Sequence, residues 1–444
     1  MRWLLMLLTA FLTLSSVFAW DPGPAPGVKI KNAILYMLAM TLFARFALLR
    51  RFKLQLPSIT ITFLILTVYC VFSYVAVVLF IDYPHYKILR NGFDLKNRIL
   101  DQMLFFLVFF YGAQSREDAI ALMKVVLAAW VISHVSAILD AAGIVHFGDI
   151  ERRPDGRVQG TVGESNQYGA FVALTLPAVV ALAYASKGLV RALWGAAALL
   201  TLATLLMTVS RGAYVGVTFA CMVGAWMFRR YLSGPQLLRI GAGVFGMLLV
   251  VGVVVGIWYG DLIHERLIGD VSANDMAGAS SGRTEIWANA LALMVTKPWT
   301  FITGFGWNSY WIMPLRYSPH NYYLNQWFNL GLTGLFCCIA LLAIPIRVAR
   351  TAAFKGDSET APLFVGFVIS ALAFGGANFF VDIYEPWLYY WAYAGVILRL
   401  AMLQQVPTVE APAPVATGEF SDESSGESSY ARPDPFGWVT PQRS

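Results

Sequence analysis

The chain alternates between long apolar stretches and shorter polar connections over most of its length. Apolar runs long enough to cross a bilayer as helices recur up to about residue 402. A membrane β-barrel would instead show short segments of alternating polarity. We therefore predict an all-α, polytopic membrane protein with about twelve transmembrane helices. The predicted spans are residues 2–20, 29–48, 57–81, 98–113, 118–140, 168–186, 190–209, 211–228, 237–258, 327–348, 361–380 and 386–402.

Lysine and arginine in the short connections predict the orientation of these spans. The basic short connections are 50–53, 187–191, 229–239 and 347–355. If every span crosses once, all four lie on one side, which is then the cytoplasmic side, and both termini lie there too. The longer connections face the periplasm, and they are 82–97, 141–167 and 259–326.

The chain divides into two predicted parts. Residues 1–403 form the membrane domain, and the tail 404–444 is rich in Pro, Ala, Glu and Ser, which predicts a disordered cytoplasmic segment. In the long periplasmic connection, apolar positions at helical spacing over 284–296 predict an amphipathic helix that lies over the membrane face. We expect Ser280 or Ser281 to cap this helix at its start, and Lys297-Pro298 to end it.

Composition agrees with a membrane protein and excludes several classes of site. Of 444 residues, 58% are apolar and 13% are charged, which lies far outside the usage of soluble proteins. All four cysteines fall inside apolar runs, so neither a disulfide framework nor a zinc site is indicated. The sequence contains no Asp-x-Asp pair and no phosphate-binding loop of the ATPase type. We therefore predict no metal, no cofactor and no nucleic-acid partner.

Two arginines lie at the predicted periplasmic ends of helices. Arg211 opens a span, and Gly212 and Gly216 after it form a Gly-x-x-x-Gly pair that lets a neighbouring helix approach closely. Arg283 lies in the first turn of the periplasmic helix, where free backbone N–H groups favour an anion. A snorkelling Arg211 and a surface ion pair between Arg283 and Glu285 are the plain alternatives. Two fixed cations at one face suit a phosphate-type leaving group.

His320 and Asn321 precede the span at 327–348. Histidine takes up a proton near neutral pH, so His320 is the candidate general base, and Asn321 would orient its ring or a substrate hydroxyl. An ordinary interfacial histidine is the alternative.

A glycine-rich polar stretch, 157–166, leads into another span at the same face. Within it, Glu164 and Asn166 are candidates for binding sugar hydroxyls, together with Arg157. A turn followed by a helix cap explains the same residues equally well.

These strings, in this order and on one membrane face, resemble the O-antigen ligase superfamily. That superfamily includes lipopolysaccharide O-antigen ligases, polysaccharide polymerases and some O-linked oligosaccharyltransferases. The resemblance covers about residues 155–335 and rests on 157–166, Ser210-Arg211-Gly212, 282–287, Gly304-Phe305-Gly306 and Pro319-His320-Asn321. Glu164-Ser165-Asn166 departs from the Asn-Pro-Asn of many relatives.

The resemblance implies a metal-independent, inverting glycosyltransferase of the bacterial inner membrane, with its active site facing the periplasm. The donor would be a glycan on undecaprenyl diphosphate, and the acceptor a hydroxyl of lipid A–core or of a growing polysaccharide. Arg211 and Arg283 would stabilise the leaving diphosphate, and His320 would deprotonate the acceptor. A polymerase uses the same donor and residues, so the sequence leaves ligase and polymerase open. A transporter or flippase is the alternative from another class, but the polar groups gather at one face and not in mid-span.

Overall fold

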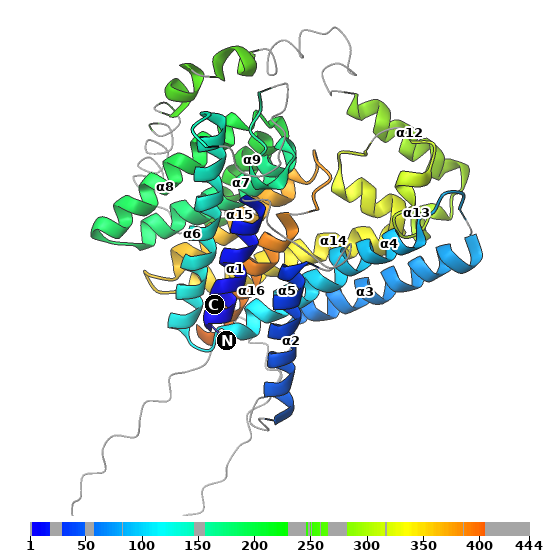
Figure 1. The fold of residues 1–444 in the computed structure, drawn as a ribbon, viewed down its shortest axis with the longest axis horizontal. Coiled ribbons are helices and arrows are strands. Elements are labelled where there is room, and N and C mark those ends of the chain that lie inside the picture. The colour runs from blue at the N-terminus through cyan, green and yellow to red at the C-terminus, as the bar shows by residue number, and fades with distance from the viewer. Residues whose placement is uncertain are drawn as a thin grey trace, which may run out of the picture. The chain divides into compact units, whose positions relative to one another are not determined.

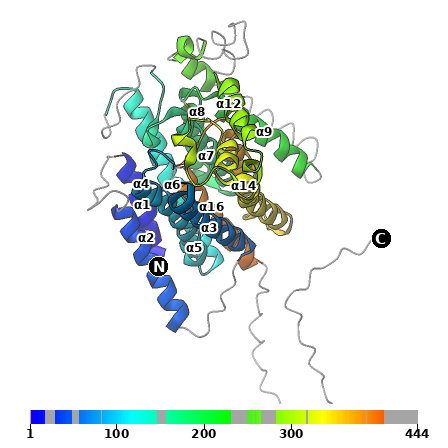
Figure 2. The ribbon, with the colours of Figure 1, turned by 90° about the vertical axis from the view of Figure 1, so that its right-hand side faces the viewer.

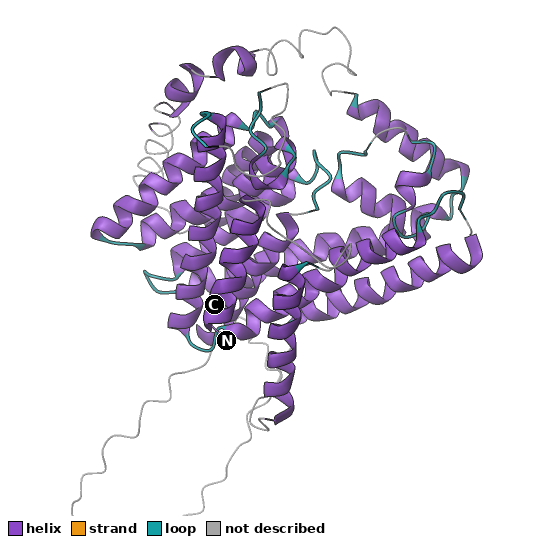
Figure 3. Cartoon of the chain, viewed as in Figure 1, coloured by secondary structure: helices purple, strands orange, loops and turns teal. Residues whose placement is uncertain are grey.

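The fold is helical throughout the part of the chain that the computed structural model describes (Figure 1, Figure 3). That part comprises residues 2–17, 29–48, 57–81, 83–145, 156–229, 246, 249, 251–257, 259–264, 282–315, 318–384 and 386–404. The first helices are α1 (Arg2–Val17), α2 (Ile30–Leu48), α3 (Ser58–Ala76) with η1 (Val77–Ile81), α4 (Ile88–Leu95), η2 (Lys96–Leu100), α5 (Asp101–Gly112) and α6 (Arg116–Ala141). The next are η3 (Gly160–Val162), α7 (Ser165–Ala185), α8 (Gly188–Met207), α9 (Arg211–Phe228) and α12 (Arg283–Thr296). The last are α13 (Thr300–Thr303), η5 (Ser309–Ile312), α14 (Tyr322–Lys355), α15 (Ala361–Ala377) and α16 (Pro386–Gln404).

The structure confirms an all-helical chain with several apolar helices. Among the described residues, six helices are long and apolar enough to cross a membrane: α2, α3 with η1, α6, α7, α8 and α14. The chain is thus a multi-pass membrane protein. The predicted span 237–258 and the tail 404–444 fall largely outside the described residues. The count of about twelve spans, the orientation and the division into domains therefore stay predictions.

The predicted connection at 82–97 is helical from Ile88 onward, which the sequence did not predict. Residues 88–112 are helical without interruption, because α4 runs through the π-helix η2 into α5. Asn91, Leu95 and Ile99 are buried at intervals of four residues, which is the pattern of one helix face. The charged residues on the other face hid this pattern in the sequence.

Tight packing fixes the start of α9, as the Gly-x-x-x-Gly pair predicts. A Cβ on Gly216 would lie 2.6 Å from the Ala373 carbonyl oxygen of α15 and 2.8 Å from the Ala377 backbone nitrogen. Gly376 of α15 faces Gly216 in return. This close backbone approach of α9 to α15 is the effect expected of paired small residues in membrane helices.

Two glycines, Gly304 and Gly331, let the backbone after α13 pack directly against a break in α14. Gly331 interrupts α14 with φ 61 and ψ −158, and a Cβ there would lie 2.0 Å from the Ile302 carbonyl oxygen. A Cβ on Gly304 would lie 2.3 Å from the Asn329 carbonyl oxygen. Only glycine permits both the left-handed φ and the close approach, so the Gly304-Phe305-Gly306 string serves packing. Helix α14 also packs on α3 and on α15 (Figure 1, Figure 2).

The amphipathic helix predicted at 284–296 is α12. Its apolar face, with Ala290 and Met294 buried, packs on a second hydrophobic cluster that also holds Phe305, Tyr310, Leu324 and Phe328. Lys297 ends the helix as predicted. The serine cap is wrong, because Gly282 occupies the N-cap position and makes no side-chain cap; Ser280 and Ser281 lie outside the described residues.

Candidate active site

Arg211 is the first residue of α9 and is half-buried. The side chain of Ser210 caps the helix, with its Oγ accepting a hydrogen bond from the Ala213 backbone N–H at 3.4 Å. Val209, just before the cap, has φ 45, a left-handed conformation that a β-branched residue rarely adopts. The backbone that carries Arg211 is therefore held by a strained turn, a cap and the contact of Gly216 with α15.

Arg283 is the first residue of α12 and lies near Arg211 and Glu164. Burial lowers the pKa of Arg283, and the positive charge of Arg211 lowers it further, while Glu164 opposes both. Two guanidinium groups are thus held close together with partial loss of water. Such a pair is unfavourable by itself and gains from an anion placed between the two cations.

Arg157, Glu164 and Asn166 form a hydrogen-bonded chain beside these arginines. Arg157 donates from Nε to the Thr208 carbonyl oxygen and from its terminal nitrogen to Asn166 Oδ1, both at 2.9 Å. Asn166 donates to Glu164 Oε1 at 2.9 Å. Glu164 Oε2 accepts from the Gln167 backbone N–H at 2.7 Å and so caps α7. The cap is therefore present, and the sugar-binding role of these three residues stays a prediction.

His320 faces the same group of charges from the segment before α14. It is half-buried, with φ 44, and its backbone N–H donates to Ser318 Oγ at 3.3 Å. Burial lowers the pKa of His320, and Arg283 lowers it further, while Glu164 opposes them. The imidazole is therefore neutral at pH 7 and able to accept a proton. A left-handed non-glycine residue held at such a position is the kind of strain that accompanies functional sites.

Helix α12 contacts the segment that carries His320 directly. Trp287 Nε1 of α12 donates a hydrogen bond to the Pro319 carbonyl oxygen at 2.7 Å. The Trp287 ring also meets the Phe379 ring edge-on, with centroids 5.7 Å apart. These contacts place Arg283, four residues before Trp287 and one helical turn away, next to the segment that carries His320.

Asn321 caps helix α14. Its Oδ1 accepts a hydrogen bond from the Leu324 backbone N–H at 3.0 Å and caps α14. That oxygen is therefore committed to the helix, and the orienting role predicted for Asn321 stays without support from a contact.

Sequence reasoning missed Asp382, which lies buried beneath the histidine segment. Asn325 Nδ2 donates to both carboxylate oxygens, at 3.0 and 2.9 Å, and the Tyr384 hydroxyl donates to Oδ2. Burial raises the pKa of Asp382 to about 6. These hydrogen bonds, the nearby charge of Arg98 and a hydrogen bond from Ser318 lower the pKa but do not outweigh burial. Ser318 therefore links the carboxylate to the backbone of His320. The available signal was an acidic residue in a strongly apolar region, with Glu385 three residues later.

The structure thus brings six of the seven predicted residues into one cluster with a positive balance: Arg157, Glu164, Asn166, Arg211, Arg283 and His320. Such a cluster can hold an anion between arginines and place a neutral base beside it. Within the described residues, no group of three or more His, Cys, Asp or Glu side chains could hold a metal ion. Independence from metal stays a prediction.

Comparison with known proteins supports the resemblance. Residues 196–339 match the family model described as O-antigen ligase. The matched region contains Arg211, Arg283 and His320, whereas Arg157, Glu164 and Asn166 precede it. No curated protein matches the chain.

Proposed function

We propose that this chain, a member of the O-antigen ligase superfamily through residues 196–339, is a periplasm-facing transferase that moves a glycan from undecaprenyl diphosphate to an acceptor hydroxyl. The family indicates a membrane glycosyltransferase of the ligase or polymerase type that acts on lipid-linked polysaccharide. The donor, the acceptor, the inverting course and the absence of a metal are parts of the proposal.

The observation that carries the proposal is that two half-buried arginines lie close to a neutral histidine. As the glycosidic bond to the diphosphate breaks, negative charge grows on the leaving oxygen. Arg211 and Arg283 stabilise that charge where they lie, with little reorganisation during the reaction. Their mutual repulsion in the free enzyme falls when the diphosphate binds between them.

His320 supplies the base in this scheme. The acceptor oxygen forms a bond to the anomeric carbon while the bond from that carbon to the diphosphate oxygen breaks, and the diphosphate leaves with the electron pair. The acceptor proton passes to the neutral imidazole. Direct displacement at one carbon inverts its configuration. No Asp-x-Asp pair is present in the sequence to hold a divalent ion on the diphosphate, which is why we propose a reaction without metal.

A ligase and a polymerase differ in the acceptor, not in the proposed residues. The ligase reaction, onto lipid A–core, is our first choice because the matching family is described as O-antigen ligase. Extension of a growing polysaccharide is the second candidate.

The test uses purified enzyme in lipid nanodiscs with a polyprenyl-diphosphate-linked glycan. Lipid A–core and a glycan of the same repeat unit are offered as separate acceptors, and products are separated on a gel. Transfer to lipid A–core identifies a ligase, and extension of the glycan identifies a polymerase. Absence of transfer to either acceptor would refute the proposed function.

A further inference from the structure

Residues 299–307 form an apolar segment whose first half lies at the surface of the molecule, and we call it the α13 segment. It consists of Trp299, the short helix α13 and the residues that follow this helix up to Trp307. Trp299 and Ile302, one helical turn apart, are 62% and 63% exposed. Neighbouring exposed apolar side chains of this size mark a contact with a partner or a membrane. The sequence predicts only that this segment lies in the periplasm, within the connection 259–326.

Helix α3 indicates the depth of the α13 segment in the membrane. The Tyr69 hydroxyl of α3 donates a hydrogen bond to the Thr303 carbonyl oxygen at 2.9 Å. Tyr69 lies in the middle of the 24-residue apolar helix Ser58–Ile81, with eleven residues before it and twelve after it. Val68 and Phe72, on either side of Tyr69 along the chain, are exposed, as side chains that face lipid are. A helix of this length and hydropathy crosses the hydrocarbon layer, which indicates that its midpoint, and Thr303 with it, lies inside that layer.

Aromatic side chains supply hydrogen-bond donors to the backbone of the α13 segment. From Phe301 to Trp307, every second carbonyl oxygen accepts a hydrogen bond from one of them. In the periplasm, water makes such bonds to an exposed backbone, whereas in hydrocarbon the protein itself must make them. Non-helical backbone occurs at membrane depth only where the protein provides partners of this kind. The four bonds run from Trp327 Nε1 to Phe301 at 3.0 Å, and from the hydroxyls of Tyr69, Tyr83 and Tyr86 to Thr303, Phe305 and Trp307, each at 2.9 Å.

The N–H groups of the α13 segment bond to α14 next to the point where Gly331 interrupts that helix. The Phe305 N–H donates to the Phe328 carbonyl oxygen at 2.8 Å. The Gly306 N–H donates to the Asn329 carbonyl oxygen at 2.9 Å. A helix that stops leaves the carbonyl groups of its last turn without partners inside the helix. The interrupted α14 and the α13 segment therefore satisfy each other's backbone groups with no need for water.

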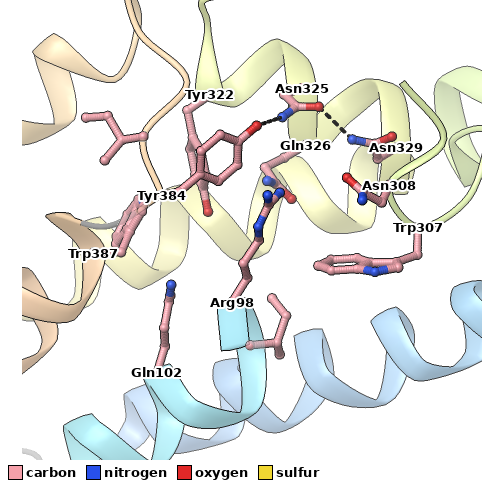
Figure 4. A pocket seen from close by; sticks show the side chains of 12 residues that line it. Arg98, Gln102, Trp307, Asn308, Tyr322, Asn325, Gln326, Asn329, Tyr384 and Trp387 are labelled. Atoms are coloured by element: carbon pink, nitrogen blue, oxygen red, sulfur yellow. Dashed lines mark hydrogen bonds between the residues drawn. The ribbon is translucent and has the colours of Figure 1, made fainter. Parts of the chain in front are cut away.

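The polar side-chain groups of the α13 segment also bond within the protein. The Thr303 hydroxyl donates to the carbonyl oxygens of Trp299 and Gly304, at 3.2 and 3.1 Å. Trp307 reaches toward the helices drawn in blue, and its Nε1 donates to the Asn91 carbonyl oxygen of α4 at 2.9 Å (Figure 4). Polar groups are thus satisfied internally, while the large exposed side chains are apolar. A loop in water has the reverse arrangement, and a surface in lipid has this one.

We propose that the α13 segment is re-entrant: it enters the hydrocarbon of the leaflet that faces the periplasm and returns to the same side. Its partner is the phospholipid bilayer, and Trp299 and Ile302 contact acyl chains beside the exposed face of α3. Lys297, exposed at the end of α12, reaches the phosphate groups with its long side chain. The connection 259–326 is then periplasmic only in part. Lipid contact of this kind does not depend on the transfer reaction.

The first experiment measures contact with water through cysteine reactivity of the full-length protein in nanodiscs. A thiol in hydrocarbon does not ionise, so we expect Ile302→Cys to react with a charged, membrane-impermeant maleimide at least about tenfold more slowly than Asn289→Cys, which is exposed on α12. Val68→Cys, on the exposed face of α3, is the lipid-facing control and should react as slowly as Ile302→Cys. Wild type gives the reaction of the native cysteines, labelling in SDS shows that each thiol is present, and thermal unfolding shows that each variant is folded. Equal rates for Ile302→Cys and Asn289→Cys would overturn the proposed lipid contact.

The second experiment identifies what covers the exposed side chains. A photoreactive benzophenone amino acid is introduced at position 302, or at position 289 as the matched control, in full-length protein in phospholipid nanodiscs. After irradiation, intact-protein mass spectrometry should show a phospholipid adduct for position 302 and little or none for position 289. A cross-link from position 302 to a second copy of the chain would assign this surface to a protein interface and overturn the proposal. Equal lipid adducts at the two positions, or none at position 302, would also overturn it.

Discussion

Replacing Gly216 with alanine should impair both stability and transfer, although Gly216 carries no chemistry. The added Cβ would lie 2.6 Å from the Ala373 carbonyl oxygen, whereas ordinary contact begins at 3.4 Å. The two helices must therefore separate by about 0.8 Å at this point. Overpacking of this kind costs about 1–3 kcal/mol. Because Arg211 lies five residues earlier on α9, the shift also moves its guanidinium relative to Arg283.

A misplacement near 1 Å can cost about a hundredfold in rate, so we expect a loss of tenfold to a hundredfold in transfer. The assay pairs thermal unfolding in nanodiscs with initial rates on a lipid-linked donor. Gly195→Ala in α8 is the control, because a Cβ there meets nothing within 4 Å. It should keep full activity and gain a little helix stability. A Gly216→Ala protein with wild-type unfolding temperature and rate would refute the packing argument.

Three further predictions concern charge and orientation. Arg211→Ala and Arg283→Ala should each slow transfer by about a hundredfold to a thousandfold in the gel assay, and lysine should rescue poorly because it lacks the planar fork; normal transfer by Arg283→Ala would reassign that residue to a surface ion pair. Asp382→Asn should lower the unfolding temperature. At pH 7 the carboxylate, with its pKa of about 6, accepts hydrogen bonds from three donors, whereas the new amide would place its own N–H donors next to them. An unchanged unfolding temperature would show that the network contributes little to stability. A reporter active only in the periplasm should be active when fused after Ser272 and silent after Ser358, and the reverse would overturn the orientation.

Local signals in the sequence predicted much of the helical framework. The span at 211–228 coincides with α9, because Ser210 caps it and apolar residues fill it without interruption. The helix at 284–296 differs from α12 by one residue, since its apolar spacing and Lys297-Pro298 are both local features. Helix bounds that depend on residues within or next to the helix can therefore be predicted from the sequence.

Features that depend on distant contacts were not predicted. The first part of the helix that starts at Ile88, up to residue 97, looked like a polar connection, because only its buried face is apolar. The break at Gly331 depends on the backbone of Ile302, and the buried network of Asp382 depends on Asn325. None of these partners is near in sequence.

The candidate site was predicted from residue types and from their placement at one face of the membrane. That prediction named Arg211, Arg283 and His320, which the structure brings together. It assigned Asn321 to orientation, whereas the structure uses its oxygen to cap α14. Capping and binding use the same side chains, and only the geometry separates the two uses.

The most direct test of the central claim is transfer by His320 variants as a function of pH. His320→Gln accepts a hydrogen bond but cannot become a cation, and His320→Asn tolerates the left-handed backbone better, so it serves as the structural control. Both should bind the polyprenyl-diphosphate donor, unfold at the wild-type temperature and fail to transfer. Because burial and Arg283 lower the pKa of His320, the neutral base persists below the usual value of about 6.5.

Wild-type activity should therefore fall only when the pH drops below about 6.5, and it should be unchanged by EDTA. Near-normal turnover by His320→Gln would contradict the role of His320 as general base. Turnover that EDTA abolishes and a divalent ion restores would contradict a reaction driven by arginine and histidine alone.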